Sequence, residues 1–236
     1  MDKQLTVLLT RPEPGATDFA AMLPGALVMI SPMMVIRPVK ADFGLVDAVV
    51  ITSSHAIPAV SKLPGAPTCF CVGTATTQKA MAQGLTAVMA GETAQDVAAY
   101  VIAENPRGQI LYARGSHIAF DMVGRLRAAG LKIDERVVYD QVAAPLSRDA
   151  TQLLKSQATV VLPLFSARSS HLFFAACPDE ARLKVIAISD TVAETIPKHH
   201  RADMMVLPKP DAARMAQAVL FSASGGNRLE QDKTAQ

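Results

Sequence analysis

The chain has 236 residues, half of them apolar, which is enough for one large domain or two small ones with buried cores. Its formal net charge is only +2, so composition gives no indication of binding to nucleic acid or to an anionic membrane. The apolar runs are short and are interrupted by proline, glycine and charged residues, which excludes a membrane-spanning helix.

The three cysteines are Cys69, Cys71 and Cys177, and an odd number is typical of reduced thiols. The first ten residues contain an apolar strand-like run without the features of a signal peptide, so we expect a cytoplasmic protein. Cys69 and Cys71 share one face of a strand, but a metal site would need two further ligands at a recognisable spacing. The sequence does not supply these ligands, and we expect no metal.

Apolar, β-branched segments alternate with helical patterns along the chain. The predicted strands are Leu5–Thr10, Leu27–Ile30, Ala48–Thr52, Thr68–Val72, Leu85–Met89, Gln109–Ala113, Lys132–Val142, Thr159–Phe165, Lys184–Ile188 and Asp203–Leu207. The predicted helices are Ala16–Met22, Ala56–Lys62, Ala75–Gln83, Ala94–Ala103, Ala119–Ala129, Asp149–Gln157, Ser169–Ala176, Val192–Lys198 and Asp211–Phe221. This alternation indicates an α/β fold with mostly parallel sheets. Residues 226–236 are expected to form a flexible tail.

Two strand-like segments, 33–39 and 136–142, each follow a short βαβ-like unit and each end at or near a proline. We expect them to run side by side and to cross between two separate bodies of the chain. Tyr139 lies in the second segment, where valines alternate with polar residues. One interpretation of Tyr139 is simply a half-buried strand tyrosine.

The two halves of the chain resemble each other, because each contains three similar turns after its strands. The turns carry arginine (Arg11 and Arg114), serine (Ser53 and Ser166) and threonine (Thr76 and Thr191). Ligands of open parallel sheets bind beyond the carboxyl ends of the strands, where helix N-termini favour anions. For any single turn, plain helix capping is an alternative. Six turns of repeated type predict two facing lobes with a polar, anion-tolerant cleft and no strong nucleophile.

The sequence lacks the glycine-rich loops of nucleotide and dinucleotide sites, and it lacks the nucleophile elbow of hydrolases. A nucleotide-dependent transferase is therefore disfavoured. The histidines show no spacing typical of metal ligands. His55 and His117 each follow a strand and are candidates to face the cleft, whereas His199 and His200 are expected in a solvated loop.

The segment Thr10–Gly15, Thr-Arg-Pro-Glu-Pro-Gly, resembles the corresponding turn of uroporphyrinogen-III synthases. The resemblance covers about residues 5 to 221, in matching order and spacing. The further segments that carry it are Ile51–Ala56, Val72–Thr76, Arg114–Gly115, Val138–Tyr139, Leu164–Ser169 and Pro208–Pro210.

The resemblance implies two α/β lobes joined by a two-stranded β-ladder, with the active site in the cleft between them. Carried onto this sequence, lobe one comprises residues 1–34 and 143–225, and lobe two comprises residues 35–142. The crossing strands are then the segments 33–39 and 136–142. A monomer without nucleic-acid or membrane partners is expected.

The implied reaction is the cyclisation of hydroxymethylbilane, with loss of water and inversion of the last pyrrole ring, and without cofactor or metal. Tyr139 matches the strand tyrosine of the family and is expected to assist departure of the hydroxyl group. The substrate is a linear tetrapyrrole polycarboxylate. The residues expected to bind it are Arg11, Thr52, Ser53, Thr76, Arg114, Ser166, Arg168 and Thr191.

Three positions depart from the family pattern. Ala167 follows Ser166 where many relatives have proline, Ser189 stands where glycine is frequent, and Asp190 is unexpected beside a polyanion. The alternative function is a non-catalytic, two-lobed binding protein for an anionic metabolite, which would share the repeat and the cleft.

Overall fold

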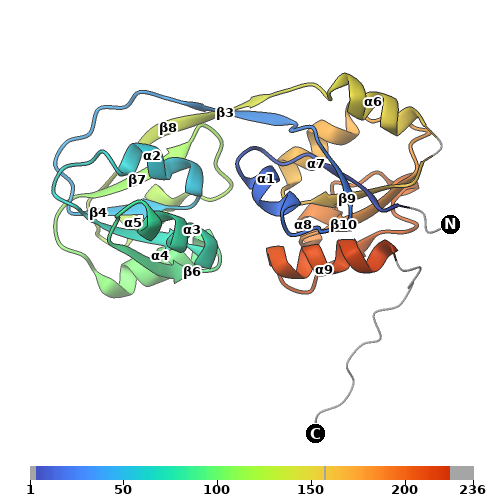
Figure 1. The fold of residues 1–236 in the computed structure, drawn as a ribbon. Coiled ribbons are helices and arrows are strands. Elements are labelled where there is room, and N and C mark those ends of the chain that lie inside the picture. Colours follow the sequence, from blue (N-terminus) through green and yellow to red (C-terminus); the bar gives the residue numbers. More distant parts are fainter. Residues whose placement is uncertain (1–3, 157, 224–236) are drawn as a thin grey trace, which may run out of the picture. The chain divides into compact units, whose positions relative to one another are not determined.

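The structure is a computed structural model that describes residues 4–156 and 158–223, and Figure 1 shows its fold. The chain divides into two compact units, which we describe separately. Unit 1 comprises Met1–Val35 and Ala143–Gln236, and unit 2 comprises Ile36–Val142. The predicted tail and the predicted helix end at Gln157 lie outside the described residues. Within the described ranges, none of the helices is long and apolar enough to cross a bilayer.

The described part of unit 1 contains a five-stranded sheet with the strand order β11-β10-β9-β1-β2. Its strands are β1 (Thr6–Leu9), β2 (Leu27–Ile30), β9 (Val160–Leu164), β10 (Leu183–Ala187) and β11 (Met205–Val206). All of these neighbours pair in parallel. Parallel sheets need apolar cover on both faces, and the continuous apolar runs of β1 and β9 meet that need.

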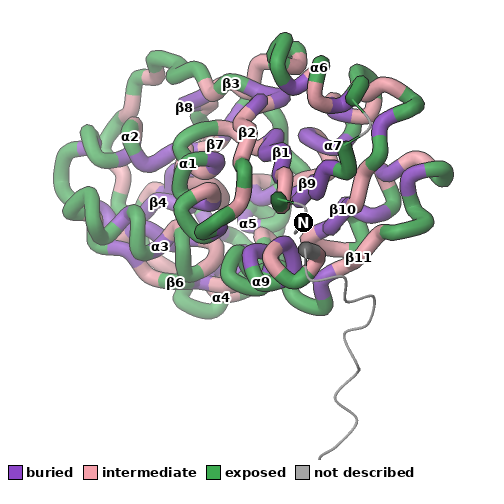
Figure 2. The backbone as a smooth tube through the Cα atoms, turned by 45° about the vertical axis from the view of Figure 1, so that its right-hand side comes forward, coloured by how far each residue is buried: buried purple, intermediate pink, exposed green. Residues whose placement is uncertain are grey.

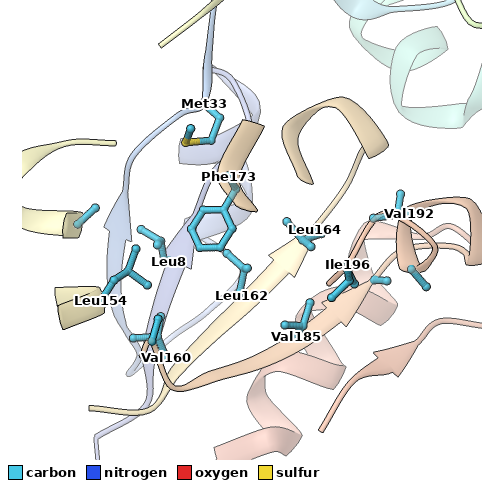
Figure 3. Close-up of a cluster of buried hydrophobic side chains, with 14 residues drawn as sticks. Leu8, Met33, Leu154, Val160, Leu162, Leu164, Phe173, Val185, Val192 and Ile196 are labelled. Carbon is cyan, nitrogen blue, oxygen red and sulfur yellow. The ribbon is translucent and has the colours of Figure 1, made fainter. Parts of the chain in front are cut away.

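Helices cover both faces of the unit 1 sheet. One face packs on α6 (Arg148–Lys155), α7 (Ala167–Phe174) and α8 (Asp190–Ala193), and the other on α1 (Gly15–Ala20) and α9 (Ala212–Ala223). Leu8 belongs to the first core and Leu9 to the second, as expected for alternating strand side chains. Figure 3 shows the first core, in which Phe173 of α7 lies over Leu162.

The described part of unit 2 contains a six-stranded sheet with the order β3-β8-β7-β4-β5-β6. Its strands are β3 (Met34–Pro38), β4 (Ala48–Ile51), β5 (Thr68–Val72), β6 (Ala87–Gly91), β7 (Ile110–Gly115) and β8 (Ile133–Ala143). The helical elements are the 3-10 turn η1 (Ser54–Ala56), α2 (Ile57–Val60), α3 (Gly73–Ala82), α4 (Ala94–Glu104) and α5 (Met122–Ala128). The central strands β4 and β7 are almost entirely buried, as the largely purple tube at these two labels in Figure 2 shows, and the three middle residues of β5 are buried as well.

Strand alternation also divides the unit 2 core. Val49 and Ile51 of β4 pack in the core that contains residues of α2 and α3. Val50 packs on the opposite face, with residues of α4 and α5. Tyr139 and Tyr112 therefore belong to different faces of the sheet, the first on the α2 side and the second on the α4 side.

Strands β3 and β8 are the elements in which the chain passes from one unit to the other, and they are neighbours in the sheet. The amide of Val39 donates to the carbonyl of Val138, and the amide of Ala144 donates to that of Met33, so the two strands run antiparallel. The predicted pairing of segments 33–39 and 136–142 is confirmed. The two strands do not form a separate ribbon, however, because β8 also pairs in parallel with β7.

The prediction of an α/β fold with mostly parallel sheets is confirmed, and most errors concern the ends of elements. The expectation of a solvated loop at His199 and His200 is wrong, because both lie in the 3-10 turn η2 (Lys198–His200) and His200 is buried. Helix α5 starts at Met122 and not at Ala119, because the Asp121 carboxylate accepts a hydrogen bond from the amide of Gly124. Strand β6 starts at Ala87 and not at Leu85, because the Leu85 amide still closes the end of α3 by donating to Ala80.

Candidate functional site

The carboxyl ends of the parallel strands in unit 2 bring several polar side chains to one edge of the sheet. Thr52 and Ser53 directly follow β4, Arg114 is the penultimate residue of β7, and Tyr139 lies in β8. Ile51 is paired with Ala113, and Gly115 with Tyr139, so the three strands present these residues at one level. Ligands of open α/β sheets bind at such an edge.

The phenol of Tyr139 is a deeply enclosed polar group at this edge. Tyr139 is only 5% exposed, and its ring lies 5.6 Å from the ring of His55 between centroids. Burial raises the pKa of the Tyr139 phenol, and hydrogen bonds with the Ser53 side chain and the Gly115 backbone partly oppose that shift. The phenol is therefore neutral near pH 7 and acts as a hydrogen-bonding group.

The partners of the Tyr139 phenol determine where its own proton can go. The backbone N–H of Gly115 can only donate, so the phenol oxygen accepts that bond. The Ser53 hydroxyl already accepts a 3.3 Å hydrogen bond from the His55 amide, and its hydrogen can be donated to the phenol oxygen. When Ser53 donates in this way, the phenol can offer its own hydrogen to a third group, such as a bound ligand.

Glycine is required at position 115 because the aromatic ring packs directly on the backbone. A Cβ atom at Gly115 would lie 2.6 Å from Cε2 and 2.9 Å from the hydroxyl oxygen of Tyr139, closer than carbon atoms approach in proteins. The sequence analysis singled out the Arg114-Gly115 dipeptide for its arginine. Its glycine also matters, because it leaves room for the ring of Tyr139.

Arg114 does not present an open guanidinium, because Glu135 of β8 holds it. Nε of Arg114 donates to Oε2 of Glu135 at 2.7 Å, and Nη2 donates to Oε1 at 3.0 Å. Nη1 donates to the carbonyl oxygen of Gly115 at 2.9 Å. The hydrogen bond between the two side chains raises the pKa of Arg114 and lowers that of Glu135. The expected partner of Arg114 was a substrate carboxylate, and the structure provides a carboxylate of the protein itself.

Tyr112 is a further phenol at this edge that the sequence analysis missed. Its hydroxyl lies 3.0 Å from Oγ1 of Thr52, and the residue is 3% exposed. Burial raises the pKa of Tyr112, while the hydrogen bond with Thr52 lowers it. The signal was present, since Tyr112 precedes Arg114 by two residues on one strand and so shares its face. Thr52 is thus fixed by a protein partner.

Thr76 lies in the first turn of α3 and is half-buried. The helix begins at Gly73, whose φ of +65° is in the left-handed region, and its N-cap residue Val72 provides no side-chain hydrogen bond. The serine turn differs, because Ser53 caps η1 with its own hydroxyl. The amide groups at the start of α3 therefore lack a side-chain cap, which favours an anion there.

In unit 1, Arg11 follows β1 and lies against aromatic side chains. Its guanidinium carbon is 4.3 Å from the centroid of the Phe165 ring, a cation–π contact. Phe165 in turn packs edge-on against Phe19 at 4.8 Å. Burial lowers the pKa of Arg11, and the charges of Asp18 and Glu13 partly compensate. Arg11 stays cationic, since an arginine in a protein does not lose its proton.

Ser166, Arg168 and Thr191 lie at the carboxyl edge of the same sheet, each with its own local surroundings. Ser166 caps α7 by accepting from the Ser169 amide at 3.2 Å, and its hydroxyl donates to that of Ser169 at 3.0 Å. Nε of Arg168 donates to the sulfur of Met34 at 3.2 Å. Thr191 is exposed in the first turn of α8, next to the exposed Asp190. An acidic residue is favourable there because of the helix dipole.

The structure is that of an α/β protein with two units, each built on a mainly parallel sheet. Each unit has hydroxyl and guanidinium groups at the carboxyl edge of its sheet. Among residues 4–156 and 158–223, no group of three or more His, Cys, Asp or Glu side chains is arranged to hold a metal ion. This combination defines a class of proteins that suits small polyanionic ligands.

Comparison with known proteins identifies the family. The family described as "Uroporphyrinogen-III synthase HemD" matches residues 23–217, and the chain belongs to the uroporphyrinogen-III synthase family. Members of this family are cyclising lyases of haem biosynthesis that act on a small-molecule tetrapyrrole. The assigned reaction is therefore the cyclisation of hydroxymethylbilane to uroporphyrinogen III, and nothing in the comparisons supports a non-catalytic binding protein.

Solved structures agree with this fold. A uroporphyrinogen-III synthetase from Helicobacter pylori is 13% identical, with a TM-score of 0.67 over 93% of this chain and 99% of that chain. A mutant uroporphyrinogen III synthase from the extremely thermophilic bacterium Thermus thermophilus is 15% identical, with a TM-score of 0.53 over 94% of this chain and 99% of that chain. No curated protein sequence matches significantly.

Proposed function

We propose that hydroxymethylbilane binds at the carboxyl edges of the two sheets, with contacts from lobe one (residues 1–34 and 143–225) and from lobe two (residues 35–142). The substrate carries carboxylates along its length, so a site made of hydroxyls, amides and a few cations suits it. The support is the chemistry of the two edges, each of which offers such groups. The uncapped start of α3 beside Thr76 adds backbone donors for one carboxylate.

The proposed catalytic residue is Tyr139. The bond that breaks joins a hydroxymethyl carbon of an electron-rich pyrrole to oxygen, and it ionises once the oxygen receives a hydrogen bond or a proton. A phenol is a sufficient donor for this step. The observation that carries the proposal is the placement of the Tyr139 phenol, which is buried at the carboxyl edge of the unit 2 sheet with its hydroxyl group against Gly115.

Loss of water leaves an azafulvene cation, which the substituted carbon of the last ring must attack to form a spiro intermediate. Direct closure without inversion gives the type I isomer, so the main task of the protein is to orient the chain. We assign that task to carboxylate contacts from both units. The proposed contacts are Arg11, Thr52, Ser53, Thr76, Ser166, Arg168 and Thr191, and Arg114 acts at the same site.

We further propose that the enzyme works as a cytoplasmic monomer without cofactor. The free thiols Cys69, Cys71 and Cys177 support a reducing compartment. Size-exclusion chromatography coupled to light scattering would measure the oligomeric state, and a dimer mass would contradict this part of the proposal.

The decisive experiment is to supply hydroxymethylbilane and to separate the isomers of the product. Wild-type protein is expected to form type III faster than spontaneous closure forms type I. In Tyr139→Phe we expect the rate to fall about a hundredfold or more and the product to shift toward type I. Tyr100→Phe is the matched control, since Tyr100 packs on Phe70 in the α4 core and lies outside the proposed site.

Each outcome has a distinct meaning. Wild-type protein that yields only type I would contradict the assigned reaction. A folded Tyr139→Phe variant that makes type III at the wild-type rate would leave the reaction standing and would remove Tyr139 from the mechanism. Folding is checked by the unfolding free energy, for which loss of the hydroxyl costs about 1 kcal/mol.

A further inference from the structure

We infer that the Arg114–Glu135 ion pair is a positioning device for the Tyr139 phenol and not a site for a substrate carboxylate. The inference rests on the proposed role of Tyr139 and extends it to two residues that do not touch the phenol. The connection runs through one residue, Gly115, which contacts the ion pair through its carbonyl group and the phenol through its amide.

The ion pair fixes the carbonyl side of Gly115. The guanidinium of Arg114 forms two nearly parallel hydrogen bonds with Glu135, of 2.7 and 3.0 Å, and uses Nη1 for the Gly115 carbonyl oxygen at 2.9 Å. The planar guanidinium of Arg114 is hydrogen-bonded on two sides and cannot rotate without losing hydrogen bonds. A lysine side chain cannot reproduce this arrangement. The direction of the Gly115 carbonyl is therefore determined by Glu135 through Arg114.

The pairing of β7 and β8 is irregular at Gly115, and this irregularity brings Tyr139 opposite Gly115. Arg114 is paired with Val137, but the next residue, Gly115, is paired with Tyr139. Such irregularities re-aim backbone and side-chain groups next to active sites. The amide of Ser116 resumes the pairing by donating to the carbonyl of Tyr139 at 3.0 Å. Gly115 is thus held on both sides, and the ring and hydroxyl group of Tyr139 pack directly on it.

The electrostatics argue against a direct role of Arg114 in substrate binding. The Arg114 side chain is 15% exposed and its charge is compensated by Glu135, so a substrate carboxylate would have to compete with an intramolecular partner. The groups that face the pair also include Tyr112 on β7 and Arg127 of α5. The guanidinium of Arg11, by comparison, lies over the aromatic ring of Phe165.

The test is Glu135→Gln, which keeps the size of the side chain and removes its charge. We expect kcat for type III formation to fall by about tenfold to a hundredfold, since small displacements of a catalytic group have effects of this size. KM should change little, because no substrate contact is lost. Arg114→Lys should have the same effect. Asp134→Asn is the matched control, since Asp134 pairs with Arg127 at 3.4 Å and is 56% exposed.

A second measurement reports on the surroundings of the Tyr139 phenol and does not depend on enzyme activity. Tyrosine labelled with ¹³C at the ring carbon that bears oxygen reports the ionisation of each phenol, and Tyr139→Phe assigns the signal. We expect the Tyr139 signal to shift and to titrate differently in Glu135→Gln, and to be unchanged in Asp134→Asn. This readout separates positioning from a general loss of stability, which is measured in parallel by denaturant unfolding.

The outcomes separate this inference from the proposed function. Glu135→Gln with wild-type kcat and an unchanged Tyr139 signal would overturn the inference while type III formation persists. A raised KM with unchanged kcat in Arg114→Lys would also overturn it, in favour of a substrate contact. Wild-type protein that forms only type I would contradict the proposed function, and the labelled phenol would still test the positioning. If Glu135→Gln does not fold, Glu135→Asp keeps the charge but shortens the side chain, and it is expected to lower kcat because the two hydrogen bonds to Arg114 are lost.

Discussion

The phenol of Tyr139 is buried although much of its strand is not, and its ring packs on the backbone of Gly115. Such a contact requires the absence of a side chain at position 115. A glycine that follows an arginine at the end of a strand is thus a part of the site, although it carries no chemical group. The contribution of Gly115 to the reaction can be measured with the substitution Gly115→Ala, which adds a single methyl group.

Gly115→Ala is expected to impair the reaction more than the fold. The new Cβ would lie 2.6 Å from the Tyr139 ring, so the ring must move by a few tenths of an ångström or more. We expect kcat to fall by about tenfold or more and the product to shift toward type I. Gly44→Ala is the control, because nothing lies within 4 Å of a Cβ at Gly44. Equal kcat values for the two variants would contradict the role of Gly115.

Individual site residues were predicted from the sequence with uneven success. Tyr139 and Ser53 were both predicted, and the Ser53 side chain is one of the groups that lower the pKa of the buried Tyr139 phenol. Glu135 was not chosen, because its partner Arg114 lies on another strand and the register of two strands cannot be read from a single sequence. Burial of Tyr112 beside Thr52 depends on the same register and was missed for the same reason.

At the level of elements, the starts of the helices distinguish capping from ligand binding. Ser147 caps α6 by accepting from the Ala150 amide at 3.1 Å, and Ser166 caps α7 by accepting from the Ser169 amide at 3.2 Å. Both caps accept from the amide three residues further on, but the Ser166 hydroxyl also donates to that of Ser169, and only Ser166 belongs to the proposed site. Substitution of Ser147 therefore measures the effect of losing an N-cap outside the proposed site.

Ser147→Ala and Ser166→Ala should each lower the free energy of unfolding by about 1 kcal/mol, because each removes one N-cap. Only Ser166→Ala is expected to raise KM for hydroxymethylbilane, by severalfold, since a contact to a substrate carboxylate is lost in addition. Denaturant unfolding and steady-state kinetics measure the two effects. If both variants keep the wild-type KM, Ser166 is a cap and nothing more.

Element types were predicted well because the apolar runs of parallel strands are unambiguous when helical patterns separate them. Boundaries were predicted less well where side chains outside the pattern decide them, as Asp121 does for α5. The Thr turns illustrate a further limit. Thr76 and Thr191 follow strands as expected but lie inside the first turn of a helix and do not cap it.

At the level of the whole molecule, the cysteine thiols of both units have raised pKa values and therefore low reactivity. Burial raises the pKa of Cys69 and Cys177 to about 12 and that of Cys71 to about 11, from an ordinary value of 9.0. A thiol that ionises more readily in the unfolded chain than in the folded one favours unfolding at alkaline pH. The stabilisation is complete below pH 9 and is lost as the pH rises toward these raised values.

We therefore expect the free energy of unfolding to decrease between pH 9 and pH 11, and to decrease less steeply in Cys71→Ala. At pH 8 the native thiols should react with iodoacetamide roughly a hundredfold more slowly than those of the unfolded chain. Mass spectrometry of the alkylated protein measures the second effect. Rapid alkylation of Cys69 in the native state would contradict its burial.

The division of unit 1 into two separate chain segments dictates an order of events during synthesis. Strand β1 lies between β2 and β9, and β9 is made only after the whole of unit 2. At about 5–20 residues per second, β1 and β2 wait on the order of ten seconds for β9. During this interval one edge of β1 is open to pairing with other chains, which is the general hazard of an uncovered strand. Unit 2 is continuous and complete once Val142 has been made, so it is the first part of the newborn protein that is able to fold.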